Sequence, residues 1–299
     1  MLYKQIEDNK RKTIWLVIVF SLLVMAIGWA IGYIFGNDPY VGLIVTGIIL
    51  AFYLPVTYLS ATSQVLSMAG AKEIKREDNP QLFNIIEELT IPANIPMPKV
   101  YIVNDPSPNA FATGINPKKG AVAFTTGLLE KLNREELEGV VAHELAHIRN
   151  YDIRLMTICI ALVGVIAIIA NYGSRMMFYG GGRRTRGNNN RKGHPILMIV
   201  AILLVILAPI VSQFVRMAVS RNREYLADAT AVEFTRNPQG LINALQKISS
   251  DPRDVQNAQE ATAALYISQP FKNKRKKKRG SLLATHPPIE SRIERLQKM

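Results

Sequence analysis

The sequence predicts a mainly α-helical membrane protein with four hydrophobic segments and a smaller α+β part that contains a small β-sheet or hairpin. Three observations lead to this prediction: four long apolar runs without a charge, a stretch of mixed composition between the second and third runs, and a helical pattern that places two histidines on one face. A helical span needs about 20 apolar residues, and each run reaches about that length.

The first two runs, Thr13–Phe35 and Tyr40–Leu59, are predicted to form a transmembrane hairpin, with Gly36–Pro39 as the turn between them. A secretory signal peptide is the competing interpretation of the first run, because Ala30-x-Gly32 resembles a small-residue cleavage site. Hydrophobic cores of signal peptides are shorter, about 7–15 residues, which favours an uncleaved membrane anchor.

Charges near the first run predict the orientation of the hairpin. Basic residues precede it, which places the amino terminus in the cytoplasm under the positive-inside tendency. The turn then faces outward, and the chain returns to the cytoplasm after the second run. The basic residues are Lys4, Lys10, Arg11 and Lys12.

The third and fourth runs, Leu155–Tyr172 and Ile196–Val215, leave their topology open. The loop between them, Gly173–Gly193, contains six basic residues and no acidic residue. If both runs span the membrane, this loop faces outward, against the positive-inside tendency. A re-entrant hairpin would remove the conflict, and in both arrangements the chain returns to its starting side.

The stretch between the second and third runs carries alternating helix and strand signals. Asn79-Pro80 precedes apolar residues at helical spacing, which predicts a capped helix. Val100–Val103 predicts a strand, and Asn109–Gly114 and Ala121–Thr125 flank a turn-forming segment, which predicts a β-hairpin. A further short helix is predicted from Leu128.

The helix that follows Asn133 carries the chemistry. Asn133 and Glu136 form a capping-box pattern at its start. His143 and His147 are four residues apart on one helix face, so both imidazoles can bind one Zn²⁺. Glu144 lies beside that face, where its carboxylate can take a proton from a water molecule on the metal. This H-E-x-x-H arrangement is typical of zincin proteases and predicts a zincin-type α+β catalytic domain.

A second acidic pair follows the fourth run. Glu224 and Asp228 are four residues apart on a predicted helix. A catalytic zinc takes three protein ligands and keeps one position for water, and two histidines with one glutamate are a known set. Glu224 is therefore the predicted third ligand, and Asp228 could accept a hydrogen bond from a ligating histidine. The competing interpretation is an Arg-rich surface helix with ordinary ion pairs one turn apart.

These patterns divide the chain into four predicted parts. Residues 1–63 form the amino-terminal transmembrane hairpin, and residues 64–154 form the first portion of the catalytic domain with the H-E-x-x-H helix. Residues 155–215 hold the third and fourth membrane segments with their basic loop, and residues 216–299 supply the third zinc ligand. One Zn²⁺ per chain is expected, at the membrane surface, because the two portions meet only if the intervening segments return the chain to one face.

Four motifs, taken together, resemble the HtpX family of bacterial membrane-bound zinc metalloproteases. That family is similar to the wider family that includes the CAAX prenyl proteases. The resemblance covers nearly the whole chain. It implies that the two histidines and Glu224 bind zinc, that Glu144 is the catalytic base, and that His286 steadies the oxyanion. The motifs are His143-Glu144-x-x-His147, Arg-x-x-Glu224-Tyr-x-Ala-Asp228, Asn109-Ala-Phe-Ala-Thr-Gly114 and Thr285-His286-Pro287-Pro288.

Two of the implied roles have alternatives. Asn109, Ala110, Phe111 and Ala112 resemble the substrate-side strand of that family, whose edge would pair with an extended peptide through main-chain hydrogen bonds. An interior hairpin fits these residues equally well. For His286, the alternative is a capping or packing role before the following prolines.

The net charge and the single cysteine set the expected partners and compartment. With 36 Lys+Arg and 23 Asp+Glu, the formal charge is +13. Beside four membrane segments, this charge favours membrane lipids as partners rather than nucleic acid, for which no fold motif is present. The densest basic stretch, residues 272–279, is expected to be a solvated loop that could contact anionic headgroups. Cys159 excludes an intrachain disulfide and is expected to be buried.

The predicted function is a zinc endopeptidase that cleaves misfolded or membrane proteins at the cytoplasmic face of the bacterial cell membrane, a quality-control role that the resemblance implies. A prenyl-protein protease shares the chemistry, but those relatives carry more membrane spans than the four runs here. A non-enzymatic membrane scaffold with a structural zinc is disfavoured, because structural sites usually fill four protein ligands.

Overall fold

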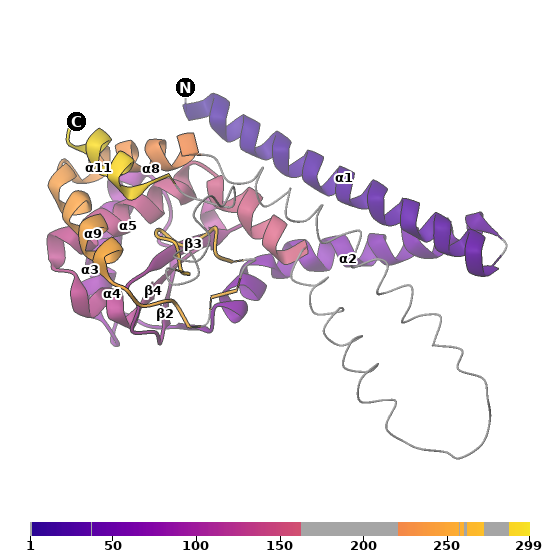
Figure 1. Cartoon of the computed structure of the whole chain (residues 1–299), viewed down its shortest axis with the longest axis horizontal. Coiled ribbons are helices and arrows are strands. Elements are labelled where there is room, and N and C mark those ends of the chain that lie inside the picture. The colour runs from indigo at the N-terminus through magenta and orange to yellow at the C-terminus, as the bar shows by residue number, and fades with distance from the viewer. Residues whose placement is uncertain (1, 37, 163–220, 257, 260–261, 272–286) are drawn as a thin grey trace, which may run out of the picture.

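The computed structural model describes residues 2–36, 38–162, 221–256, 258–259, 262–271 and 287–299 (Figure 1). The described chain is mostly helical and contains one small mixed sheet. A long pair of helices extends from a body in which helices surround the sheet. The third predicted hydrophobic run lies outside the described residues from residue 163 on, and the fourth lies outside them entirely.

The two extended helices are α1 (Leu2–Gly36) and α2 (Pro39–Met68), joined at the predicted turn. The Asp38 side chain caps α2 by accepting a hydrogen bond from the Tyr40 N–H at 2.9 Å. Within the described residues, two stretches are long and apolar enough to cross a membrane, Ile6–Ala30 and Pro39–Met68.

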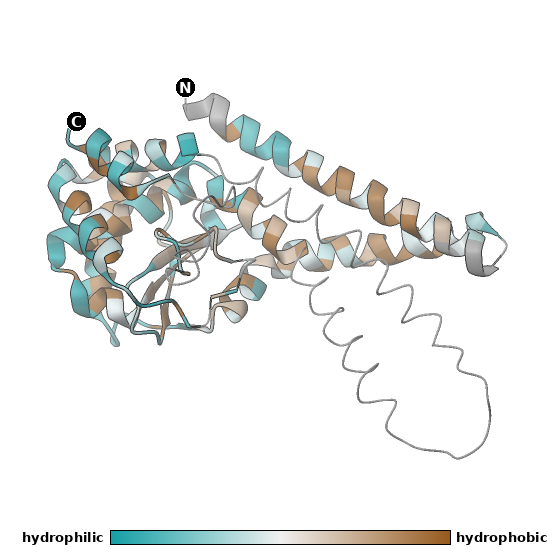
Figure 2. Ribbon diagram, in the orientation of Figure 1, coloured by the Kyte–Doolittle hydropathy of each residue, from teal (hydrophilic) through white to brown (hydrophobic). Residues whose placement is uncertain are grey.

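These helices keep large apolar side chains exposed, and Figure 2 shows that hydrophobic residues recur along both of them. Trp15 is 65% exposed and Phe52 is 73% exposed. A core helix of a soluble protein would bury such side chains, because removing apolar surface from water is what stabilises a core. The exposure therefore favours lipid as their solvent, as the sequence predicts.

The sheet has the strand order β1-β2-β4-β3. The strands are β1 (Ala71–Glu73), β2 (Lys99–Val103), β3 (Ala110–Gly114) and β4 (Gly120–Thr125). The antiparallel pairing of β3 with β4 confirms the predicted hairpin, with Ala112 opposite Val122. β2 pairs with β4 in parallel, and β1 adds an antiparallel edge that the sequence patterns did not predict.

The other labelled helices belong to the body, together with a helix over residues 152–162. They are α3 (Pro80–Ala93), α4 (Thr126–Lys131), α5 (Arg134–Arg149), α8 (Arg221–Thr235), α9 (Pro238–Ser250) and α11 (Ile289–Leu296). α5 lies at the centre of the body and contributes Val140, Val141 and Leu145 to the largest apolar core. Its start has the predicted capping box, in which the Asn133 side chain accepts from the Glu136 N–H at 3.0 Å and the Glu136 carboxylate accepts from the Asn133 N–H at 2.9 Å. α3 likewise begins after Asn79, as predicted.

A second apolar cluster joins the helix pair to the body. Leu16 and Phe20 of α1 and Leu50 of α2 are buried in the same cluster as Leu155 and Cys159. The last two belong to a helix over residues 152–162 that directly follows α5. This packing brings the first turns of α1 beside the carboxyl-terminal end of α5, where the predicted metal ligands lie. The Cys159 thiol is buried and free, in agreement with the sequence-based expectation.

Candidate active site

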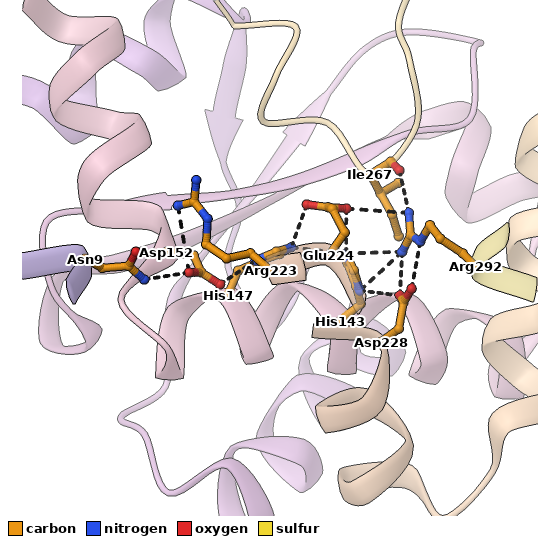
Figure 3. Close-up of polar contacts among 9 residues, drawn as sticks. All are labelled: Asn9, His143, His147, Asp152, Arg223, Glu224, Asp228, Ile267 and Arg292. Atoms are coloured by element: carbon orange, nitrogen blue, oxygen red, sulfur yellow. Dashed lines mark hydrogen bonds and ion pairs between the residues drawn. The ribbon is translucent and has the colours of Figure 1, made fainter. Parts of the chain in front are cut away.

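The central helix α5 and the later helix α8 bring the three predicted metal ligands together (Figure 3). The Nε2 atoms of His143 and His147 are 3.2 Å apart. Oε1 of Glu224 lies 3.6 Å from Nε2 of His147, and Oε2 lies 3.8 Å from Nε2 of His143. One ligand atom from each residue lies within 4.8 Å of the others.

These separations fit one zinc ion. Two atoms that each stand about 2.1 Å from a tetrahedral Zn²⁺ are about 3.4 Å apart, close to the distances among the three side chains. Two imidazoles and one carboxylate are also a known ligand set for a catalytic zinc. The donor set and its spacing therefore suit a metal with one remaining coordination position.

His147 is oriented by Asp152, a residue to which the sequence analysis assigned no role. Oδ2 of Asp152 lies 3.1 Å from Nδ1 of His147. Tyr151 adopts a left-handed conformation with φ of 60°, which turns the chain between α5 and the helix over residues 152–162. The contact fixes the ring so that Nε2 faces the ligand position. An acidic residue just beyond the end of the H-E-x-x-H helix was the available signal.

His143 is oriented by Asp228, as the sequence analysis expected of this carboxylate. Oδ1 of Asp228 lies 3.0 Å from Nδ1 of His143. Both side chains are almost fully buried, His143 on α5 and Asp228 on α8. Since Nδ1 is used for this contact, Nε2 of His143 is also left for a metal.

Asp228 is in turn held by Arg292 of α11, a residue that sequence reasoning missed. The Arg292 guanidinium is fully buried and donates to both carboxylate oxygens of Asp228, at 2.6 and 2.8 Å. It also donates to the Ile267 carbonyl at 3.1 Å and lies 3.7 Å from Glu224. A bidentate pair of this kind is the geometry in which arginine binds carboxylates best. Its position four residues after Pro288 gave no sequence signal, because the partner is 64 residues away.

The two histidines differ in their affinity for protons. Burial lowers the pKa of His143 to about 4, and the nearby charge of Arg292 acts in the same direction, although Asp228 opposes it. Burial also disfavours the charged form of His147, but its hydrogen bond to Asp152 and the charge of Glu224 prevail and raise its pKa to about 9. Without a metal, the site therefore carries a proton on His147 and none on His143 at neutral pH.

Glu144 is buried and has no support of this kind among the described residues. No group in the described part of the chain meets both the distance and the angle of a hydrogen bond to its carboxylate oxygens, although the Ala112 backbone faces them closely enough to lower the pKa slightly. Burial raises its pKa to about 7, so its ionised and protonated forms are close in free energy near neutral pH. An unpaired buried carboxylate is costly for stability, and such a group is suited to accepting and releasing a proton.

Glu144 faces a cavity between the edge of the sheet and a later segment of the chain. Ala112 of β3 lines this cavity, and so do Ala264 and Leu265 of the later segment. His147 and Glu224 also line this cavity, so the ligand position opens into it. The cavity places a ligand position, an available carboxylate and an edge strand next to one another.

The four residues of the predicted substrate-side strand are not equally open to that cavity. The Asn109 side chain donates to the Ser268 carbonyl at 2.9 Å, and the Ala110 carbonyl accepts from the Ile267 N–H at 2.9 Å. Phe111 packs edge-on against Tyr266 at a centroid distance of 5.1 Å. The chain's own segment therefore covers the first three positions, and Ala112 is the one that lines the cavity.

Other predicted features lie outside the described residues. They are His286 with Thr285 of its motif, the loop at residues 173–193 and the basic stretch at residues 272–279. Their roles stay predictions.

The side-chain set defines a metallopeptidase centre of the H-E-x-x-H type, in a protein with two candidate membrane spans among its described residues. Residues 76–299 match Peptidase family M48. The chain belongs to this family and is a metalloprotease, which confirms the family resemblance found in the sequence and argues against a non-enzymatic scaffold.

Relatives of the same length support this assignment. A protein described as "Protease HtpX homolog" from Listeria monocytogenes serotype 4a (strain HCC23) is 53% identical over 306 residues, covering 100% of both chains. One with the same description from Ligilactobacillus salivarius (strain UCC118) is 50% identical over 303 residues, again covering 100% of both. The crystal structure of S. mikatae Ste24p is 19% identical, with a TM-score of 0.48, and the comparison covers 98% of this chain and 67% of that one.

Proposed function

We propose that this chain is a zinc-dependent endopeptidase of the bacterial cell membrane that cleaves misfolded or membrane proteins at the cytoplasmic face. The observation that carries the proposal is the meeting of His143, His147 and Glu224 beside a buried Glu144 whose oxygens lack partners among the described residues. Metal ligands next to an available carboxylate are the minimum requirement for metal-assisted peptide hydrolysis.

The residues divide the work as follows. His143, His147 and Glu224 would hold one Zn²⁺, with Asp228 and Asp152 fixing the two imidazole rings. When bound, Zn²⁺ acts as a Lewis acid that polarises the scissile carbonyl and lowers the pKa of water enough for it to lose a proton and attack near neutral pH. Glu144 would accept the proton of the attacking water and deliver it to the leaving amine.

The substrate is proposed to bind as an extended strand beside β3. The backbone of Ala112 faces both the cavity and the Glu144 carboxylate. A peptide that paired with Ala112 through main-chain hydrogen bonds would lie across the site with little demand on its sequence. Asn109 and Ala110 would support this strand indirectly, because their polar groups bind residues 267 and 268.

His286 is proposed to stabilise the oxyanion from outside the ligand set, as the family resemblance implies. His286→Ala should then lower kcat while leaving zinc content and KM close to those of the wild type. Loss of zinc or of folded protein in this variant would favour the alternative packing role.

The cytoplasmic orientation rests on the basic residues before the first span. The antiparallel arrangement of α1 and α2 supports it, because the body of the protein then lies on the same side as the amino terminus (Figure 1). Protease protection of the body in inverted membrane vesicles would contradict this orientation.

The decisive test is cleavage of casein by the purified full chain, with and without a chelator. We expect chelator-sensitive cleavage, and we expect Glu144→Gln to retain zinc but to lose activity by about 10²–10⁴-fold, the contribution of a general base. Glu135→Gln on the exposed part of the same helix is the matched control and should behave as the wild type. Full activity of Glu144→Gln would refute the assignment of the base, and cleavage confined to prenylated peptides would favour a prenyl-protein protease.

A further inference from the structure

Asn9 of α1 is a buried polar residue whose side chain reaches the metal site. It is 3% exposed, although it belongs to the charged stretch at the start of the chain. Its Nδ2 donates to Oδ1 of Asp152 at 2.7 Å and lies 3.3 Å from the Asn150 carbonyl, which it can also reach as a donor (Figure 3). Asn150 is the carboxyl-terminal cap of α5.

Asp152 therefore uses its two oxygens for different partners. Oδ2 lies 3.1 Å from Nδ1 of the zinc-ligand candidate His147, and Oδ1 accepts from Asn9. Arg223 lies 3.9 Å from Oδ1, beyond hydrogen-bond distance. Among the contacts of the described residues, the Asn9 amide is thus the short hydrogen bond that fixes the rotation of this carboxylate.

The chemistry of the amide suits this position. Asn9 donates a hydrogen bond without adding a second positive charge to that of Arg223, which stands 3.9 Å from the same oxygen. A lysine or arginine at this position would neutralise the carboxylate and weaken its hold on the imidazole N–H. An apolar residue would leave the carboxylate free to rotate away.

One further contact joins this part of α1 to the turn after α5, and another lies within α1 itself. Nζ of Lys10 stands 4.6 Å from the centre of the Tyr151 ring, over the turn that follows α5. The buried hydroxyl of Thr13 donates to the Asn9 carbonyl at 2.8 Å, within the same helix. The start of α1 is therefore joined to the end of the metal helix through Asn9 and Lys10, whereas the Thr13 hydroxyl bonds only within α1.

We propose that Asn9 is a positioning residue of the metal centre, through which the first membrane helix fixes Asp152 and, through Asp152, His147. The inference rests on the proposed zinc site. It makes α1 more than an anchor, because a displacement of this helix in the membrane would change the orientation of a metal ligand. The membrane environment of the helix and the affinity for zinc are then linked.

Zinc competition against a fluorescent chelator tests this proposal on the full chain in detergent micelles. Loss of an outer partner of a ligating histidine lowers metal affinity by about 10–100-fold, and for Asn9→Leu we expect the lower end, about tenfold. Thr13→Val is the matched control, since it removes a buried polar group one turn away on the same helix. Its affinity should equal that of the wild type.

A double-mutant comparison separates positioning from general destabilisation. If Asn9 acts through Asp152, Asn9→Leu should weaken zinc binding no further in a chain that already carries Asp152→Asn. A purely structural role would instead lower the melting temperature of the metal-free protein and leave the zinc-induced rise in melting temperature unchanged. Asn9→Ala is measured in the same way and decides the matter if Asn9→Leu does not fold.

Equal zinc affinity of Asn9→Leu and the wild type, or a loss that adds in full to that of Asp152→Asn, would overturn the proposal. A wild-type chain that binds no zinc would instead refute the metal site itself, so the two failures are distinguishable.

Discussion

The two histidines of the metal site receive the same local contact from very different parts of the molecule. His143, Asp228 and Arg292 form the inner side, in which a buried ion pair from α8 and α11 supports the imidazole. His147, Asp152 and Asn9 form the outer side, in which a neutral amide from the membrane helix α1 supports the carboxylate. The His143 side chain is 1% exposed and the His147 side chain is 15% exposed.

One requirement, a fixed imidazole tautomer, is therefore met in two ways in the same site. The inner side uses opposite charges deep in the body, where an unpaired charge is costly. The outer side uses a dipole at the junction with the membrane helices, where its loss should change metal binding more than stability.

Removing Arg292 should have the largest effect on stability. Arg292→Leu leaves Asp228 as a buried charge without its bidentate partner, and breaking such a pair costs about 3–5 kcal/mol of the free energy of unfolding. Chemical denaturation of the metal-free protein measures this loss of the free energy of unfolding, with Lys298→Ala on the exposed end of the chain as the control. A wild-type transition for Arg292→Leu would show that the inner side is not held by this pair.

Removing the charge of Asp152 should act mainly on the metal. Asp152→Asn should lower zinc affinity by about 10–100-fold, with a smaller loss of stability than Arg292→Leu because it removes a buried charge instead of leaving one without its bidentate partner. Chelator competition and denaturation of the same preparation compare the two effects. If Asp152→Asn destabilises the metal-free chain as much as Arg292→Leu does, the proposed division between the two sides is wrong.

The pH dependence of zinc binding should come from the outer side. With a pKa of about 9, raised above the ordinary 6.5, His147 is protonated at neutral pH in the metal-free protein. Zinc must displace this proton, so affinity should rise by about tenfold per pH unit up to about pH 9. Conversely, the stabilisation of the metal-free form by this proton is present below about pH 6.5 and is lost as the pH rises through about 9.

Calorimetry of zinc binding in buffers of different ionisation enthalpy measures the number of protons that the protein releases when it binds the metal. We expect about one proton at neutral pH, and a smaller number for Asp152→Asn, which lacks the partner that raises the pKa. His143, with a pKa of about 4, contributes none near neutrality. An affinity that does not change between pH 6.5 and 8 would contradict the assignment of the proton to His147.

The exposed end of α5 should show the smallest effect. Arg134 pairs with Glu138 at 2.8 Å and with Glu88 at 2.9 Å on the surface of the body. Solvent screens such pairs, so Arg134→Ala should leave zinc affinity and melting temperature unchanged. A loss of zinc in this variant would mean that the metal helix is sensitive to any change along its length.

What the sequence predicted follows from short-range rules. The capping box, the spacing of the two histidines and the hairpin all depend on residues within a few positions of one another, where helix and strand periodicity determine the geometry. Glu224 is the exception, because it is remote from His143 in the chain. It was predicted because a catalytic zinc requires a third ligand and an acidic pair stood at helical spacing.

What the sequence did not predict depends on tertiary contacts. Asn9 and Asp152 are separated by 143 residues, and Arg292 and Asp228 by 64. An asparagine in a charged amino-terminal stretch and an arginine in a charged final helix resemble solvated surface residues until packing buries them. The cover over β3 likewise depends on residues 266–268, which have no local pattern that indicates a partner.

Zinc K-edge X-ray absorption on the purified full chain measures the ligand set of the metal. We expect two imidazole nitrogens at about 2.0–2.1 Å and oxygen ligands at about 2.0–2.2 Å around one zinc per chain, with the zinc lost in Glu224→Ala. A spectrum with fewer than two imidazoles, or one that Glu224→Ala leaves unchanged, would contradict this ligand set.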